Sequence, residues 1–393
     1  MSPSRAYVLF SAVHGIMFMV AATTYVPFLQ SIGLTLSDVS WVNGWFWAAI
    51  VVFEVVTGMW ADSHSRIWTI RMGALFFIFG HAIFFFADNI WWVLAAEMMN
   101  GVGFAFLSGV LQAWVVDALK HHGLEDQKGE VFANAAIVKG ALSAPAAILG
   151  AWIGAHFGLR WPWVLSALAA VAGLIIVVLF MNGDGEVKAE VKVNKKEALR
   201  RSLMALRMSP ALRWSTAAGL AFNMVLAFNH YWPRFYEQYV SVADLAYVWS
   251  PLYFALFLAG VVVRRAQIPS GAEASALVLS LVVSGVGLAA MGYAPGLGML
   301  IVLGVVHEAG RGAFQPLTSS YSNHHVSSEY RATFGSLQAL IEDMGAAVVL
   351  FTISGHMNGR ADSPENIRAV WLGAGVLLVA LAVILYFLRP KQE

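Results

Sequence analysis

The stretch Gly58-Met59-Trp60-Ala61-Asp62-Ser63-His64-Ser65-Arg66 is a short charged turn between two long apolar segments. It follows the pattern G-x-x-x-D-x-x-x-R. Glycine lets two helix ends approach closely, Asp62 can sit at a helix N-terminus, and Arg66 can reach a second carboxylate. A charge pair of this kind on one face of a membrane could lock helices together as a gate. The alternative is a solvated loop whose positive charge only sets the topology.

The composition indicates a membrane protein. Of the 393 residues, 59% are hydrophobic and 12% are charged, whereas soluble domains carry about 25% charged residues. The net charge of +1 argues against a nucleic-acid partner. The sequence contains no cysteine, which excludes disulfides, thiolate nucleophiles and Cys-ligated metals. The first apolar run, residues 7–29, is longer than the hydrophobic region of a signal peptide, so we expect it to be a retained span.

Twelve apolar segments are long enough to cross a bilayer, which takes about 20 residues. They begin near Tyr7, Trp41, Ile67, Ile90, Val131, Trp161, Ala211, Leu245, Ala276, Gly296, Ala332 and Ala369. With the N-terminus in the cytoplasm, 18 of the 24 Lys and Arg residues fall in cytoplasmic segments and 3 in outside loops. This asymmetry follows the positive-inside rule. We therefore expect a multi-pass protein of the cytoplasmic (cell inner) membrane with both termini inside.

The longest polar interval, Asn182 to Ser209, separates six spans from six. It predicts an N-terminal six-helix bundle at residues 1–181, a basic cytoplasmic linker at 182–210 and a C-terminal six-helix bundle at 211–393. Two repeated halves are a common layout of transporters. The linker carries a basic, helix-prone run from Lys195 to Arg207, which could bind anionic lipid headgroups or simply lie along the cytoplasmic surface.

The six spans, the basic loop, the six further spans and the charged turn after the second span together resemble the major facilitator superfamily. Residues 54–58, Glu-Val-Val-Thr-Gly, and residues 113–117, Ala-Trp-Val-Val-Asp, resemble its drug-efflux-like branches. The resemblance covers the whole chain. It implies an all-α membrane fold of 12 transmembrane helices in two six-helix bundles, and transport of a small solute by alternating access.

The resemblance also assigns a gate to the charged turn. It implies that Arg66 pairs with Asp117 at the end of the fourth span, and that Asp62 lies near the helix starting at Arg331. The expected gate residues are Gly58, Asp62, Arg66 and Asp117.

The sequence departs from the drug-efflux pattern at two places. Glu97 stands four residues before Gly101, where the family often has an arginine. The fifth span carries Gly140, Pro145, Gly150 and Gly154, which only loosely resemble the glycine/proline motif of antiporters. The alternative for these small residues is ordinary close packing between helices.

Ionisable groups at membrane depth are costly and usually face a cavity. Four acids are candidates for carrying a coupling proton: Glu54, Glu308, Glu342 and Asp343. Glu54 could instead make a structural hydrogen bond within the gate. Glu342 and Asp343 are adjacent, so their side chains point about 100° apart and at most one should face a cavity fully.

Further polar residues within the spans are candidates for substrate binding. They are His14, Glu97, Asn100, Lys139, Asn223, His230, Arg234, His307 and Arg311. Glu308 and Arg311 are spaced i,i+3 and share a helix face, so they could recognise a polar substrate or form a purely structural pair. Lys139 could snorkel to the surface, and a lone histidine such as His14 or His81 is more often a packing residue. The polar and aromatic outer end of the seventh span resembles the region where seventh helices of the family bend and gate, with Pro233 expected to break the helix. The alternative is an interfacial aromatic belt with a snorkelling arginine.

The sequence carries no enzyme signature and no Walker loop. His324, His325 and Glu329 are a weak suggestion of metal binding, and we expect no metal and no cofactor, with a proton gradient as the driving force. The expected function is proton-coupled efflux of drug-like or metabolite compounds, by a monomer in the lipid bilayer. The alternative is proton-coupled uptake of a polar nutrient such as a sugar or organic acid. A non-transporting membrane scaffold is the third possibility, and charges spread over several spans argue against it.

Overall fold

The computed structural model describes residues 1–63, 65–181, 195–266, 268–326 and 331–390. These residues form helices and loops and contain no strand, and eleven of their helices are long and apolar enough to cross a membrane. The predicted all-α membrane fold is therefore confirmed. The chain divides into two compact units. Unit 1 comprises Met1–Glu190 and Val240–Tyr247, and unit 2 comprises Val191–Tyr239 and Val248–Glu393.

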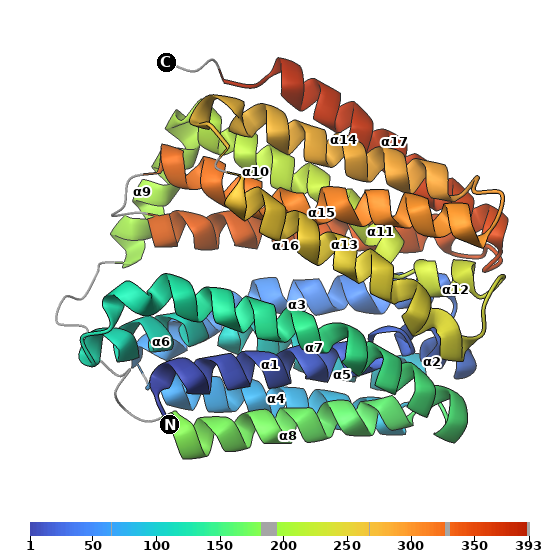
Figure 1. Cartoon of the computed structure of the whole chain (residues 1–393), viewed down its shortest axis with the longest axis horizontal. Coiled ribbons are helices and arrows are strands. Elements are labelled where there is room, and N and C mark those ends of the chain that lie inside the picture. The colour runs from blue at the N-terminus through green and yellow to red at the C-terminus, as the bar shows by residue number, and fades with distance from the viewer. Residues whose placement is uncertain (64, 182–194, 267, 327–330, 391–393) are drawn as a thin grey trace. The chain divides into compact units, whose positions relative to one another are not determined.

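Unit 1 contains the helices of the first six predicted spans (Figure 1). They are α1 (Pro3–Ala22), α2 (Tyr25–Ser31), α3 (Leu36–Ser63), α4 (Arg66–Phe86), α5 (Ile90–Leu107), α6 (Val110–His121), η1 (Glu125–Gln127), α7 (Lys128–Phe157) and α8 (Trp161–Phe180). Polar caps start these apolar helices. Ser65 accepts a hydrogen bond from the Trp68 amide at the start of α4, and Asn89 does the same for α5.

Unit 2 contains the basic helix of the linker and most of the second set of spans. Its elements are α9 (Lys195–Met208), α10 (Pro210–Phe222), η3 (Asn223–Val225), α11 (Leu226–Asn229), α12 (Trp232–Tyr236), α13 (Leu245–Arg265, from Val248 onward), η5 (Ser270–Ala272), α14 (Glu273–Met291), α15 (Leu297–His325), α16 (Arg331–Met357) and α17 (Pro364–Phe387). The short η4 (Val242–Asp244) belongs to unit 1. The predicted helix at Lys195–Arg207 is confirmed by α9.

The two units repeat one packing arrangement. In unit 1, α1 packs against α7 and α8, and α4 packs against α5 and α8. In unit 2, α10 packs against α16 and α17, and α14 packs against α15 and α17. In both units the first span therefore contacts the fifth and sixth, and the third contacts the fourth and sixth. Equivalent spans of the two units therefore make equivalent contacts, and the bounds of the two six-helix bundles stay a prediction.

Small residues bring α7 close to α1. A Cβ atom added to Gly150 would collide with the carbonyl oxygen of Val20, and one added to Gly154 would lie 2.9 Å from the Thr24 methyl group. The backbones can approach this closely only because these positions carry no side chain. Gly150 and Gly154 thus make the close helix contacts expected under the packing alternative.

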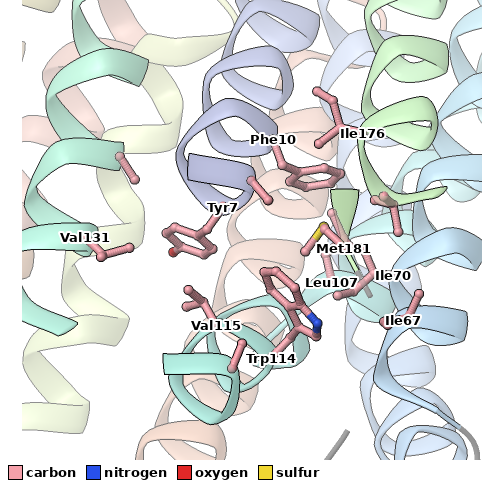
Figure 2. Close-up of a cluster of buried hydrophobic side chains, with 14 of the residues drawn as sticks. Tyr7, Phe10, Ile67, Ile70, Leu107, Trp114, Val115, Val131, Ile176 and Met181 are labelled. Carbon is pink, nitrogen blue, oxygen red and sulfur yellow. The ribbon is translucent and has the colours of Figure 1, made fainter. Parts of the chain in front are cut away.

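An apolar core near one end of unit 1 holds α6 against its neighbours (Figure 2). Trp114 and Val115 of α6 are fully buried against Tyr7 of α1 and Ile70 of α4. Burial of an aromatic side chain of this size contributes strongly to stability. Val115 lies two residues before Asp117 on α6. This core therefore fixes the position of Asp117 relative to Arg66 at the start of α4.

The seventh predicted span is broken into short pieces, whereas the other predicted spans contain long helices. α10 has 13 residues, and the backbone stays in the right-handed helical region at Asn223, Val225 and Leu226, so the helical path continues as a 3-10 turn into α11. The Asn223 side chain donates to the Glu342 carbonyl oxygen of α16 at 2.8 Å, and Pro233 lies in the first turn of α12. Because the indole of Trp371 donates to the Ala227 carbonyl oxygen at 3.1 Å, a backbone acceptor near the break is satisfied.

Candidate functional site

The ion pair implied for the charged turn is present. The Arg66 guanidinium pairs with the Asp117 carboxylate and also donates to the Ala113 carbonyl oxygen at 3.1 Å. Both side chains are partly exposed, at 30% for Arg66 and 24% for Asp117. Gly58 and Asp62 lie in α3, and their surroundings fall outside what the structure describes, as does the expected contact of Asp62 near Arg331. The role of these four residues as a gate stays a prediction.

Glu54 of α3 faces a break in the fourth span. Its carboxylate accepts a hydrogen bond from the Ser108 hydroxyl at 2.8 Å. Ser108 and Gly109 separate α5 from α6, and Gly109 has the left-handed backbone that favours glycine, with φ of 68°. One turn on, the Thr57 hydroxyl lies 3.0 Å from the Ala105 carbonyl oxygen. The structural hydrogen bond considered for Glu54 is therefore made.

Glu97 of α5 is the centre of a buried hydrogen-bonded group. The Tyr25 hydroxyl donates to its carboxylate at 2.5 Å, and the Asn43 amide donates to the Tyr25 oxygen at 2.6 Å. Glu97 is only 6% exposed and Asn100, one turn further along α5, only 4%. Tyr25 and Asn43 were not predicted, because nothing in their spacing shows that they meet a residue more than 50 positions away.

His14 lies in a cage of aromatic rings. The ring centroids of Phe10, Phe18, Phe77 and Phe104 are 5.1–6.0 Å from the centroid of its imidazole. His81 of α4 is buried and contacts two of the same rings, Phe18 and Phe77.

Lys139 of α7 lies beside this cage. Its aliphatic chain runs along α1 at Gly15, where an added Cβ atom would lie 2.7 Å from the Lys139 Cγ atom. The residue as a whole is exposed. The structure therefore brings His14 and Lys139 together.

In unit 2, α15 carries the predicted charge pair. The Arg311 guanidinium lies 2.6 Å from the Glu308 carboxylate. Glu308 is fully buried and Arg311 is 15% exposed. His307 is also fully buried, and its Nδ1 atom lies 2.8 Å from the Ser284 carbonyl oxygen of α14. The i,i+3 spacing predicted this pair correctly, and Oε2 of Glu308 and Nε of Arg311 are buried with no hydrogen-bond partner among the described residues.

Glu342 of α16 lines a cavity of about 200 Å³ within unit 2. Its carboxylate accepts a hydrogen bond from the Gln338 amide at 2.9 Å, and the Ser322 hydroxyl lies 3.3 Å from the Gln338 carbonyl oxygen. The residues that line the cavity come from α15, the start of the following loop and α16. They are Gln315, Thr318, Ser319, Ser322, Val326, Phe334, Gly335, Gln338, Ala339 and Glu342.

The cavity adds residues to the site that were not predicted. Gln338 could have been found, because it lies one helical turn before Glu342 on the same face. Thr318 and Ser322 are also spaced i,i+4, in a stretch rich in hydroxyl side chains. Asp343 is not among the lining residues, in keeping with the expectation that at most one of the adjacent acids faces a cavity.

The polar residues of the seventh span make contacts within unit 2. Asn223 is bonded to the backbone of α16. The His230 ring is buried, with its Nδ1 atom 3.3 Å from the Leu226 carbonyl oxygen. Arg234 pairs with Glu237 at 3.2 Å. None of the three is among the residues that line the cavity.

Glu273, the first residue of α14, is a buried acid that the sequence did not single out. Its carboxylate accepts a hydrogen bond from the Ser320 hydroxyl at 2.5 Å, and the His324 Nδ1 atom lies 2.9 Å away. The metal site suggested by His324, His325 and Glu329 includes one residue, Glu329, that lies outside the described part of the chain. Over the described part of the chain, no group of three or more His, Cys, Asp or Glu side chains could hold a metal ion.

These features define a multi-pass membrane protein of two helical units with polar sites inside its bundles. A model of the Major Facilitator Superfamily matches residues 7–272, and the chain belongs to this family of transporters. The predicted resemblance is thereby confirmed.

The relatives agree with this assignment. Multidrug resistance protein 2 of Bacillus subtilis (strain 168) is 30% identical over 143 residues, which is 35% of this chain and 34% of that protein. The match thus spans about a third of the curated relative. Among solved structures, the nucleoside transporter NupG has a TM-score of 0.80 at 12% identity over the full length of both chains. A D-xylose-proton symporter has a TM-score of 0.79 at 11% identity, over 99% of this chain and 97% of that one. At these identities the two structures show the fold.

Proposed function

We propose that this chain is a proton-coupled antiporter that exports small organic cations, with Glu342 as the carboxylate that binds the proton and the cation in turn. The observation that carries this proposal is the lining of the unit 2 cavity. Glu342 is its one charged residue, and no lysine or arginine is among the lining residues. A carboxylate without a basic partner attracts a cation, and protonation of the same carboxylate would release it.

The other three acids fit the role of proton carrier less well. Glu308 is already paired with Arg311, and breaking a buried ion pair is costly. Glu54 is bonded to Ser108 and Asp343 does not line the cavity.

The size of the cavity limits what it can hold. Pockets that enclose a drug-sized ligand have volumes of about 300–1,000 Å³, and this cavity has about 200 Å³. It would therefore receive the charged end of a larger solute, or a small cation entirely. The name of the Bacillus relative, a multidrug resistance protein, supports export of drug-like compounds over uptake.

A second candidate is proton-coupled uptake of a hydroxylated solute such as a sugar. The observation that favours it is the density of hydrogen-bonding groups, because Gln315, Thr318, Ser319, Ser322 and Gln338 all line the cavity. Under either candidate we place the protein in the cytoplasmic membrane as a monomer with both termini inside. The gate would be formed by Gly58, Asp62, Arg66 and Asp117.

The two candidates differ in whether substrate displaces a proton. Purified protein in weakly buffered detergent would be mixed with tetraphenylphosphonium, D-xylose or benzoate over a range of starting pH values, and proton release recorded. We expect release on addition of the cation to the wild type, and none with Glu342→Gln. Glu365→Gln is the matched control, because Glu365 is an exposed acid in the first turn of α17. Binding of D-xylose without proton release would overturn the antiporter and favour uptake.

A further inference from the structure

The interior of unit 1 contains several buried polar atoms that no described protein group satisfies. They lie on α1, α4, α5 and α8 and have no hydrogen-bond partner among the described residues. They are Nε2 of His14, Nε of Arg71, both ring nitrogens of His81, Oδ1 of Asn100, Nε1 of Trp163 and Oγ of Ser166. Buried polar groups in proteins are almost always bonded to protein or to ordered water. Groups of this kind on neighbouring helices indicate internal water molecules, each of which bridges two to four such groups.

These groups follow one another through the bundle from Glu97. Asn100 lies one turn after Glu97 on α5, and its Oδ1 atom occupies the space where a Cβ atom of Gly80 would stand. The next residue of α4 is His81, which is 2% exposed. Its ring lies 6.0 Å from that of Trp163. The Asn100 side chain therefore lies one helical turn from Glu97 and beside the residue that precedes His81.

The row of polar side chains continues from His81 through His14 to Lys139 on the exposed face of α7. His81 and His14 both pack against Phe18 and Phe77, at centroid distances of 5.1–6.4 Å. Lys139 then lies along Gly15, the residue after His14. Phenylalanine rings line this route and offer no competing hydrogen bonds.

We propose that His81 and His14 carry protons between Glu97 and Lys139 through water molecules held inside unit 1. An imidazole suits this task, because one ring nitrogen can accept a proton while the other releases one. In each step one proton moves from an O–H or N–H donor to a lone pair on the next group, and Lys139 exchanges its proton with the outside of the bundle. The Tyr25 hydroxyl, bonded to Glu97, is the remaining titratable group that the described contacts place at this acid. The route rests on the proposed proton coupling and gives it a path in unit 1.

The experiment measures protonation of Glu97 directly. After a rapid pH jump on purified full-length protein, time-resolved infrared spectroscopy follows the carboxyl band that Glu97→Gln removes. Glutamine is polar but cannot pass a proton on, so we expect His81→Gln to slow this band by about 100-fold, the range typical of an acid–base group, with its final amplitude unchanged. His14→Gln should act in the same way and serves as the second variant if His81→Gln does not fold. His156→Gln is the control, because His156 is an exposed histidine at the end of α7.

The outcomes separate the route from the proposed function. The route would be overturned if the Glu97 carboxyl band changed at the wild-type rate in both histidine variants. It would also be overturned if this band did not change with pH in the wild type, because the histidines would then serve only in packing. If protonation of Glu97 is slowed in the histidine variants but the protein transports cations without a proton gradient, the route is supported and the antiporter is overturned. A proton-driven transporter with an unchanged Glu97 rate would overturn the route alone.

Discussion

Glu308 shows how strongly one buried charge depends on its partner. Its carboxylate is fully buried and lies 2.6 Å from the Arg311 guanidinium. Removing one member of such a pair leaves the other charged in a medium that solvates it poorly, at a cost of about 3–5 kcal/mol, whereas replacing both by apolar side chains is often neutral.

Glu308→Gln should therefore destabilise the protein by about 3–5 kcal/mol, and Glu308→Met combined with Arg311→Met should recover most of the loss. The measurement is thermal unfolding in detergent, followed by circular dichroism. Glu237→Gln is the matched control, because Arg234 and Glu237 have the same i,i+3 spacing and Arg234 is 44% exposed. A partly exposed pair contributes less than about 1 kcal/mol. Equal unfolding temperatures for Glu308→Gln and Glu237→Gln would contradict the argument.

Single residues were predictable where the chemistry is local. The pair of Glu308 with Arg311 follows from three positions of separation on one helix. The hydrogen bond of Tyr25 to Glu97 joins residues 72 positions apart. A contact between two different spans cannot be predicted from the hydropathy of either span. Arg66 and Asp117 were paired only through the resemblance to a family, because their contact depends on how α4 and α6 pack.

At the scale of helices, the contact between α1 and α7 depends on the absence of a side chain at Gly150. Gly150→Ala would place a methyl group against the Val20 carbonyl oxygen, so the two helices must separate. We expect a loss of about 1–3 kcal/mol, as for other overpacked positions. Thermal unfolding measures it.

Gly373→Ala in α17 provides the comparison. Nothing lies within 4 Å of a Cβ atom added to Gly373, so the new methyl group meets no neighbour and alanine is the better helix former. This variant should unfold at or slightly above the wild-type temperature. The packing argument fails if Gly150→Ala does the same.

Hydropathy predicts where helices cross the membrane but not where they break. The apolar run from Ala211 predicted one continuous span up to Pro233. The structure departs from the α-helix earlier, at Asn223, where a 3-10 turn begins and the side chain bonds to the backbone of α16. A break that depends on a partner 119 residues away cannot be predicted from the composition of the span.

For the whole molecule, the distribution of positive charge predicts the orientation. The chain contains no cysteine, so a single introduced cysteine reports its own position without further engineering. Lys120 and Arg360 are both exposed. The predicted topology places Lys120 in a cytoplasmic loop and Arg360 in an outside loop. In intact cells, a membrane-impermeant maleimide should label Arg360→Cys at once.

Lys120→Cys should be labelled only after permeabilisation, because the positive-inside rule places this residue in the cytoplasm. Both variants lie in exposed positions, so a difference between them reflects the side of the membrane. The reverse pattern would invert the predicted topology and, with it, the assignment of the charged turn to the cytoplasmic face.

The hydrogen bond from the Trp371 indole to the Ala227 carbonyl oxygen makes the fluorescence of Trp371 sensitive to the position of α11 in the seventh span. The indole is fully buried in α17, and its acceptor lies in α11, between the two breaks. If α11 moves during a transport cycle, the indole exchanges this acceptor for water and its emission shifts to longer wavelength. The chain contains 15 tryptophans, so the signal is the difference spectrum between the wild type and Trp371→Phe. The same hydrogen bond that satisfies the break thus makes its motion visible without an attached dye.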